Sequence, residues 1–444
     1  MADELIELSA LEAAERIAIG ELSAEDYVGA CIERIAAADG EVRAFVHHDP
    51  DNALAQARSL DERRDSGAPL GPLHGIPVGI KDIFDTGDYP TECGSPLLKG
   101  RRPARDCAAV ARLREAGAVI IGKTVTTEFA YFHPGATRNP RDLGRTPGGS
   151  SSGSAAAVAA GMTPLAIGSQ TNGSVIRPAA FCGVYGLKPT HGTISRDGAL
   201  ILSRALDHVG VFGRSLADTA LILDVLAGHD PEDSDTRPVA SPAFLETLAD
   251  EPPRPPRLAF VRTPVWDKAD AQTRAAFEAL VVTLGDAVAT VDAGGDYAAA
   301  WEDHRVVMSV DMAHNLGPIV ARGDENASSA ALRALLAEGS NASAVRYLAA
   351  RAAAPRYAAG FDDIFGQFDA IITPATVGVA PKGTATGSPL FCTLWSLTGL
   401  PALTLPLLTG EGGMPLGVQL VGARGDDARL LRTANWLVAA LAGD

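Results

Sequence analysis

The chain has 444 residues, of which 46% are hydrophobic and 21% charged, so it can bury a large core as two ordinary domains or as one large α/β unit. Its formal net charge of −16 would repel phosphate backbones and anionic membrane surfaces. We therefore expect no nucleic-acid ligand and no membrane association, and we expect the ligand to be a neutral or cationic small molecule.

The first residues and the cysteines bear on location and cofactors. Met1–Glu4 is acidic and lacks the positive and apolar regions of a secretory signal, so we expect a cytoplasmic protein. The longest apolar stretch, residues 155–168, is interrupted by Gly161 and Pro164 and is too short to span a bilayer. The five cysteines form no CxxC pair, and no histidine stands at metal-ligand spacing. We therefore expect no disulfide framework, no metal and no cofactor.

The N-terminal third predicts helices followed by alternating strands and helices. Two helices are predicted in the first forty residues, the second beginning at the capping pattern Ser23–Asp26 and running to Ile35. Short β-branched runs at 76–84 and 118–122 flank a helical stretch at 108–116. Strands that alternate with helices indicate an α/β sheet.

The rest of the chain continues this pattern after a segment rich in Gly, Ser, Thr and Pro. An Ala-rich helix is predicted at 154–160, and a mostly helical segment at about 235–360 could cap the active site. The remaining predicted elements are strands at 258–261, 368–373, 402–406 and 416–421 and a closing helix at 427–441. Because strand character returns at the end of the chain, the two halves are predicted to interleave.

Lys81, one of the few lysines of the chain, lies in the apolar run Gly75–Phe84. Burial in such a run disfavours the charged amine and lowers its pKa, which is what a general base needs near neutral pH. The alternative is a structural lysine at a strand end, paired with Asp82 or another carboxylate.

Residues 146–154 combine Gly and Ser and run directly into the Ala-rich helix. The segment lacks the Gly-Lys-Ser/Thr ending of a P-loop, which argues against nucleotide binding. It formally matches a G-x-S-x-G nucleophile elbow with Ser151 as the nucleophile, but an elbow follows a hydrophobic strand, and residues 139–147 are predicted as loop. In that alternative the base would be a later histidine, such as His191, His304 or His314.

The third chemically informative segment is 168–183, in which Gly173 directly precedes Ser174. A serine within a turn of small and polar residues suits a nucleophile whose neighbouring N–H groups form an oxyanion hole. By itself this segment could also be an ordinary turn.

Together, the segments around Lys81, Ser150 and Ser174 resemble the amidase signature family. All three occur in that family's order and separations, and the two serines are 24 residues apart, as its pattern requires. Six further segments agree with the family: Pro72–Val78, Gly186–Thr190, Leu206–Gly210, Asp369–Ala375, Gly399–Ala402 and Gly417–Gly422.

The resemblance implies an α/β fold, with a single α/β/α domain over residues 1–444 around a large mixed sheet. It implies a Ser–cis-Ser–Lys triad of Ser174, Ser150 and Lys81, with the Gly149–Ser150 peptide bond in the cis form. It also implies an oxyanion hole built from backbone N–H groups, those of Thr171, Asn172, Gly173 and Ser174.

Four positions depart from the family's pattern. Ser152 and Asn172 stand where the family usually has Gly, and Gln170 replaces its usual Asp. The Arg that normally follows the nucleophile by two residues comes one residue later, as Arg177. Because the family's Asp and Arg are natural ion-pair partners, we expect their loss and displacement to be one coupled change in the loop.

The family resemblance points to residues 127–134 and Trp301–Pro318 for the substrate pocket. Tyr131, Phe132 and His133 are the predicted binding residues, facing a bulky, neutral aryl or alkyl amide, an anilide or a carbamate (urethane). We expect the protein to be a monomer or homodimer, with this small molecule as its ligand. The first alternative is an amidotransferase subunit that releases ammonia from glutamine inside a tRNA-dependent complex, and the second is a non-catalytic binding protein on the same fold.

Overall fold

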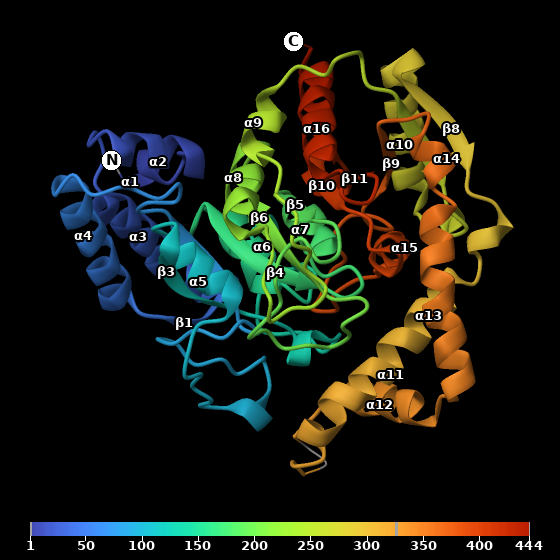
Figure 1. Cartoon of the computed structure of the whole chain (residues 1–444), viewed down its shortest axis with the longest axis horizontal. Coiled ribbons are helices and arrows are strands. Elements are labelled where there is room, and N and C mark those ends of the chain that lie inside the picture. The colour runs from blue at the N-terminus through green and yellow to red at the C-terminus, as the bar shows by residue number, and fades with distance from the viewer. Residues whose placement is uncertain (1, 325–326, 444) are drawn as a thin grey trace.

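The computed structural model describes residues 2–324 and 327–443. Among these residues, 11 strands form one mixed sheet in the order β1-β3-β2-β4-β6-β5-β10-β11-β9-β7-β8 (Figure 1). The strands are β1 (Phe45–His48), β2 (Pro77–Lys81), β3 (Val119–Thr124), β4 (Leu165–Gln170), β5 (Tyr185–Lys188), β6 (His208–Gly213), β7 (Leu258–Arg262), β8 (Val288–Asp292), β9 (Ala370–Pro374), β10 (Ala402–Thr409) and β11 (Pro415–Val421). The predicted α/β fold with a central mixed sheet is confirmed.

The sheet combines parallel and antiparallel pairings. Strand β2 runs parallel to β3 and β4, and β7 runs parallel to β8 and β9. All other neighbouring strands are antiparallel. The carboxyl ends of β2 and β4 therefore meet at one edge of the sheet, which is where α/β folds commonly place their ligand sites.

Helices surround the sheet, and some of them begin or end beyond the predicted bounds. They are α1 (Ala2–Leu5), α2 (Ala10–Ala18), α3 (Ala24–Val42), α4 (Pro50–Asp65), α5 (Ala108–Glu115), α6 (Ser152–Ala159), α7 (Ile176–Cys182), α8 (Leu216–Leu226), α9 (Phe244–Ala249), α10 (Ala271–Leu284), α11 (Ala300–Val320), α12 (Ala330–Asn341), α13 (Ala344–Ala359), α14 (Asp362–Phe365), α15 (Leu390–Thr398) and α16 (Asp427–Ala442). The N-terminal region thus forms α1, α2 and α3 rather than two helices. The segment 235–360 contains a strand, β8, that the sequence did not predict.

Both faces of the sheet are covered, as the alternation of side chains in β3 shows. Ile120 packs into the large core cluster on one face. Val119 and Ile121 pack on the other face with residues of α3, α4 and α6. Successive side chains of a strand point to opposite faces, so a strand whose neighbouring residues are all buried lies inside a layered α/β/α arrangement.

Strand β2 is shorter than predicted because the chain turns at its end. The carbonyl of Lys81 accepts hydrogen bonds from the backbone N–H groups of Ile83 and Phe84. This turn stops the strand at Lys81 and leaves its side chain at the edge where β2 and β4 end.

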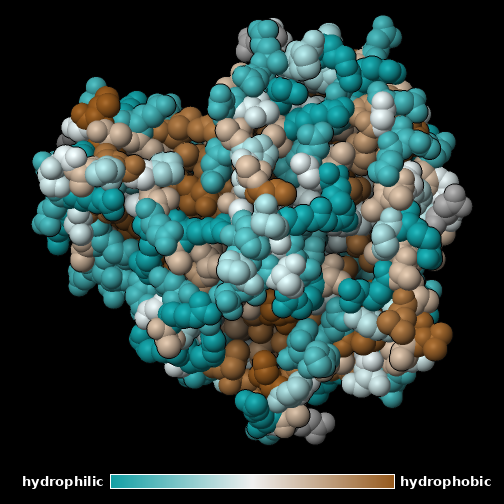
Figure 2. Space-filling view, in the orientation of Figure 1, coloured by the Kyte–Doolittle hydropathy of each residue, from teal (hydrophilic) through white to brown (hydrophobic). Residues whose placement is uncertain are grey.

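The surface is mostly polar, with scattered apolar patches. Figure 2 shows one such patch over the lower part of α13, where Val345 and Leu348 are exposed. The same view shows apolar side chains in a hollow in the lower centre of this face. Among the described residues, no helix combines the length and the apolarity needed to cross a membrane.

Candidate active site

Lys81 is completely buried and makes two hydrogen bonds through its amine. Its Nζ donates to Ser150 Oγ and to Ser169 Oγ, both at 2.8 Å. Burial lowers the pKa of Lys81 to about 7, although the nearby Asp207 opposes this shift. Asp82 pairs instead with Lys123, at 3.0 Å. Within the described residues, Lys81 forms no ion pair with Asp82 or with another carboxylate, so the structural alternative is wrong.

Ser150 lies in the loop that leads into α6, and the Gly149–Ser150 peptide bond is cis, as predicted. The next two hydroxyl groups are bound to backbone carbonyls. Ser151 Oγ donates to the carbonyl of Ser169 at 3.2 Å, and Ser152 Oγ donates to that of Val125 at 3.3 Å. Ser151 is fully buried, and no strand precedes it between residues 139 and 151. The nucleophile-elbow alternative thus lacks both its strand and a free serine.

The histidines proposed as bases in that alternative are bound to other groups or exposed. His304 Nε2 donates to the carbonyl of Thr171 at 3.0 Å, and burial lowers the pKa of His304 to about 4. His191 contacts the carbonyl of Arg204, and His314 is exposed on α11. Neither His191 nor His304 has a hydrogen bond to Ser151 in the described structure.

Ser150 and Ser174 line the same small cavity, of about 20 Å³. Their hydroxyl groups share no hydrogen bond in the described structure. A cavity of this size holds about one water molecule.

The loop 171–174 has the hydrogen-bonding pattern of an oxyanion hole. Within the described residues, none of its four backbone N–H groups donates a hydrogen bond. Its carbonyls, in contrast, all accept one: from His304, from Ser396 Oγ, from the N–H of Arg177 and from that of Ser151. With the carbonyls held, the N–H groups are free to bind the oxygen of a reacting carbonyl group.

Two further side-chain hydrogen bonds fix this loop. Thr171 Oγ1 donates to Asp207 at 2.6 Å, and burial raises the pKa of Asp207 to about 6. Thr393 Oγ1 donates to Asn172 Oδ1 at 2.7 Å. Asn172, where the family usually has Gly, therefore anchors the loop to α15 through this hydrogen bond.

Gln170 and Arg177 do not contact each other through their side chains. Gln170 Oε1 accepts hydrogen bonds from the N–H groups of Val175 and Ile176 at 2.9 and 3.0 Å. It thus supports the start of α7. Arg177 Nη2 donates to the carbonyl of Gly149 at 2.6 Å. The two side chains thus support different parts of the site, and the expectation that their changes are coupled stays a prediction.

Two of the three predicted pocket residues line the cavity of the serines. Tyr131 and Phe132 contribute to its wall, as does Met308 of α11 in the variable segment. His133 is exposed and does not line this cavity, which corrects that part of the prediction. Phe129 and Ala130, just before the aromatic pair, have φ values of 45° and 55°. Left-handed backbone is costly for such residues and is found mainly where function requires it.

Two residues with contacts at the site, Ser169 and Asp207, were not given roles from the sequence, and His304 was considered only as the base of the nucleophile elbow. Ser169 accepts from Lys81, while Asp207 and His304 hold Thr171. The only signal for Ser169 was its place within the segment that carries Ser174. Among the described residues, no group of three or more His, Cys, Asp or Glu side chains could hold a metal ion.

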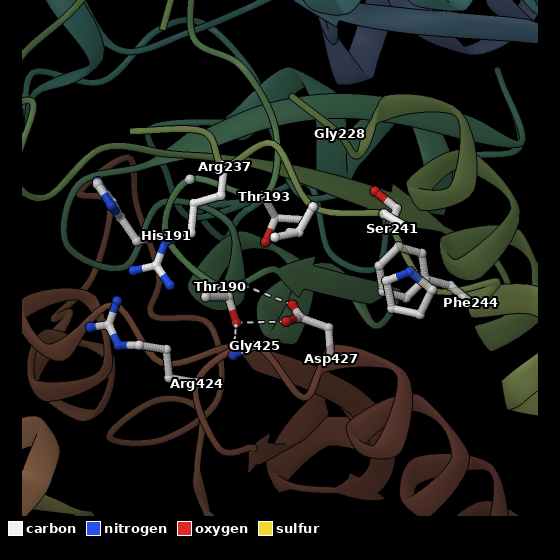
Figure 3. A pocket seen from close by; sticks show the side chains of 14 residues that line it. Thr190, His191, Thr193, Gly228, Arg237, Ser241, Phe244, Arg424, Gly425 and Asp427 are labelled. Carbon is white, nitrogen blue, oxygen red and sulfur yellow. Dashed lines mark hydrogen bonds between the residues drawn. The ribbon is translucent and has the colours of Figure 1, made fainter. Parts of the chain in front are cut away.

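A second cavity, of about 250 Å³, contains none of the triad side chains. Figure 3 shows Arg237 and Arg424 reaching toward each other beside His191 at its mouth. Asp427 on its floor accepts hydrogen bonds from the N–H and Oγ1 of Thr190.

Comparisons with known proteins agree with the motifs and the fold. The Amidase family profile matches residues 26–431. A glutamyl-tRNA(Gln) amidotransferase subunit from Chloroflexus aggregans is 36% identical over 97% of this chain and 96% of its own length. Two solved structures are also similar. The native peptide amidase from Stenotrophomonas maltophilia has a TM-score of 0.83 and 32% identity, covering 97% of this chain and 96% of its own. A chain from a vestigial protein complex that bears on the origins of an s-triazine catabolic enzyme has a TM-score of 0.89 and 32% identity, covering 97% and 98%. The protein therefore belongs to the amidase signature family.

Proposed function

We propose that the protein is an amidohydrolase that cleaves the C–N bond of a small amide through an acyl-enzyme on Ser174. One observation carries this proposal: the buried amine of Lys81, with its pKa lowered to about 7, donates to Ser150 in the pocket that also contains Ser174. A lysine that is half deprotonated at neutral pH can act as a base.

The proposed reaction begins with proton transfer along the triad. Ser174 Oγ attacks the amide carbonyl while its proton passes to Ser150, and the Ser150 proton passes to the neutral amine of Lys81. The N–H groups of the loop 171–174 bind the oxyanion. The C–N bond then breaks as the proton returns to the leaving nitrogen, and water hydrolyses the ester formed with Ser174.

In this mechanism, the missing hydrogen bond between Ser150 and Ser174 forms when the substrate binds. Catalytic hydrogen bonds are often long or poorly aligned in free enzymes and tighten in the complex. The small volume of the cavity, about that of one water molecule, supports such a rearrangement on binding.

The proposed substrates are amides and anilides with aryl or alkyl groups, and carbamates (urethanes). All of them present the same C(=O)–N unit to the triad, so the choice among them depends on the pocket. Tyr131, Phe132 and Met308 give one wall an apolar character that suits such groups. We also propose that the protein acts as a monomer or homodimer in the cytoplasm, where the described free cysteines would remain reduced.

A second candidate function is release of ammonia from glutamine within an amidotransferase complex. The observation that favours it is the 36% identity to the glutamyl-tRNA(Gln) amidotransferase subunit from Chloroflexus aggregans, which extends over almost the full length of both chains. In that case the isolated chain would show weak glutaminase activity, and a partner protein would be required for full activity.

One experiment tests both candidates. Purified wild-type protein is assayed against anilides, aliphatic amides, carbamates and glutamine, with its oligomeric state measured by size-exclusion chromatography. Hydrolysis of amides or anilides by the isolated chain, abolished in Ser174→Ala, is the expected result. Activity on glutamine alone would favour the amidotransferase candidate, and activity that survives in Ser174→Ala would contradict the proposed mechanism.

A further inference from the structure

The second cavity, of about 250 Å³, has room for several water molecules or for one small organic molecule. Its wall comes mainly from three loops, within residues 190–193, 237–244 and 424–427. It shares no lining residue with the cavity of Ser150 and Ser174. A molecule bound in the second cavity would therefore not touch the reacting groups.

Two arginines face each other at the mouth of this cavity without an acidic partner. Figure 3 shows the guanidinium groups of Arg237 and Arg424 next to each other, beside His191. Arg424 Nη2 donates to the carbonyl of Thr398. The side chain of Arg237 has no hydrogen bond, and neither arginine has an ion pair, in the part of the chain that the structure describes. Partial burial and the positive charge of Arg237 both lower the pKa of Arg424.

The acidic residues around the cavity are already bound to other groups. Asp427, on the floor, is 3% exposed and accepts hydrogen bonds from the N–H and the hydroxyl of Thr190. Asp235 and Asp426 form ion pairs with other arginines. Two like charges that lie close together without a counter-ion repel each other, and an anion between them would remove this repulsion.

The other side of the cavity combines an apolar wall with hydroxyl groups. Phe244 is 1% exposed and lines this side together with Pro242. In Figure 3, Ser241 and Phe244 lie across the cavity from the two arginines. The hydroxyl groups of Thr193 and Ser241 line the cavity and make no hydrogen bond within the described residues. Such a wall suits the body of an organic ligand whose charged group lies at the arginines.

We propose that the second cavity is a binding site for a small organic phosphate. Its phosphate group lies between Arg237 and Arg424, and its body lies toward Phe244. A phosphate monoester carries a charge close to −2 at neutral pH, which matches two guanidinium groups, whereas a carboxylate would neutralise only one of them. Each guanidinium group also presents paired N–H donors that fit two oxygens of a phosphate. The site lies outside the proposed amidohydrolase reaction, and its positive charge contrasts with the net charge of −16 of the whole chain.

The probe is phenyl phosphate, and three compounds are compared with it: inorganic phosphate lacks the ring, benzoate lacks the second charge, and phenol lacks any charge. In titration calorimetry, the wild type should bind phenyl phosphate more tightly than the other three. Arg237→Gln should lose about 10- to 100-fold in affinity for phenyl phosphate, the range for charge-assisted hydrogen bonds. Arg424→Lys, which keeps the charge but loses the paired donors, should lose less.

The control is Arg138→Gln, which removes an exposed guanidinium group that does not line this cavity and should keep the affinity of the wild type. Equal losses in Arg138→Gln and Arg237→Gln would mean that phosphate responds only to the overall charge, and would overturn the proposal. So would unchanged affinity in Arg237→Gln, or a wild type that binds no phenyl phosphate. Equal affinities for phenyl phosphate and inorganic phosphate would overturn the assignment to an organic ligand.

Melting temperatures give a second readout. A ligand that binds only the folded protein stabilises it, so phenyl phosphate should raise the Tm of the wild type and of Arg138→Gln, but not that of Arg237→Gln. The Tm without ligand shows that Arg237→Gln is folded, as expected for a side chain that holds no other group. Neither measurement uses amide hydrolysis, so failure of this assignment and failure of the proposed function are distinguishable.

Discussion

The carboxylate of Asp82 pairs with the amine of Lys123 at 3.0 Å, and not with Lys81, its neighbour in the chain. Lys123 is held further by Thr91 Oγ1 at 2.7 Å and by the carbonyl of Pro90 at 2.9 Å. The charges of Lys123 and Asp82 therefore compensate each other. Lys81 is left with hydroxyl groups as its hydrogen-bonding partners, so burial can lower its pKa without an opposing ion pair.

The pH dependence of kcat/KM should reflect Lys81. Since the mechanism needs the neutral amine and burial lowers the pKa of Lys81 to about 7, activity should be low in acid, rise through about pH 7 and level off above it. Protonation of Asp207, with a pKa raised by burial to about 6, should steepen the acid side.

Lys81→Ala should lose activity by several orders of magnitude. Separate replacements of His133, His191 and His314 should keep the shape of the profile, and a single histidine variant that abolished activity without unfolding the protein would exclude the lysine mechanism.

Ser169 should prove to be a positioning residue for Lys81. Its Oγ accepts one of the two hydrogen bonds of the amine, so Ser169→Ala should let Lys81 Nζ turn away from Ser150. We expect kcat to fall about 10- to 100-fold, with little change in KM and with a displaced acid limb of the pH profile. The matched control is Ser152→Ala, which removes a hydroxyl bound only to the carbonyl of Val125. Equal effects of the two substitutions would show that Ser169 has no special relation to Lys81.

His304 should matter for the oxyanion loop and not for proton transfer. Its N–H holds the carbonyl of Thr171, so His304→Phe leaves that carbonyl without a partner and loosens the loop. We expect kcat/KM to fall on the order of tenfold, less than the 10²- to 10³-fold loss typical of removing an oxyanion donor itself. His314→Phe, an exposed position on the same helix, is the control. A changed pKa in the pH profile of His304→Phe would instead point to a direct role in proton transfer.

The sequence predicted those parts of the fold and site that depend on local patterns. The β-branched runs of β2 and β3 identified the strands next to Lys81, and the apolar surroundings of Lys81 indicated its burial. The Ala-rich run after Ser150 predicted α6, which starts two residues earlier than expected. Strand β8 was missed because its residues are half-buried or exposed and lack the apolar pattern of a core strand.

The rest depends on contacts between distant parts of the chain. Ser169 meets Lys81 across 88 residues, and His304 meets Thr171 across 133. A serine near a strand end or a histidine within a helix gives no local sign of such a partner. The unpaired state of Arg177 was also invisible, because the sequence showed only that the arginine had moved and not that its new position has no acid beside it.

The central claim is that Ser174 is the nucleophile, and covalent labelling tests it most directly. Wild type, Ser174→Ala and Ser151→Ala are each incubated with a fluorophosphonate, and the modified residue is identified by peptide mass spectrometry. We expect a single adduct on Ser174 in the wild type, the same adduct in Ser151→Ala and none in Ser174→Ala, because the Ser151 hydroxyl is buried and bound to the carbonyl of Ser169. An adduct on Ser151, or labelling that persists in Ser174→Ala, would contradict the assignment.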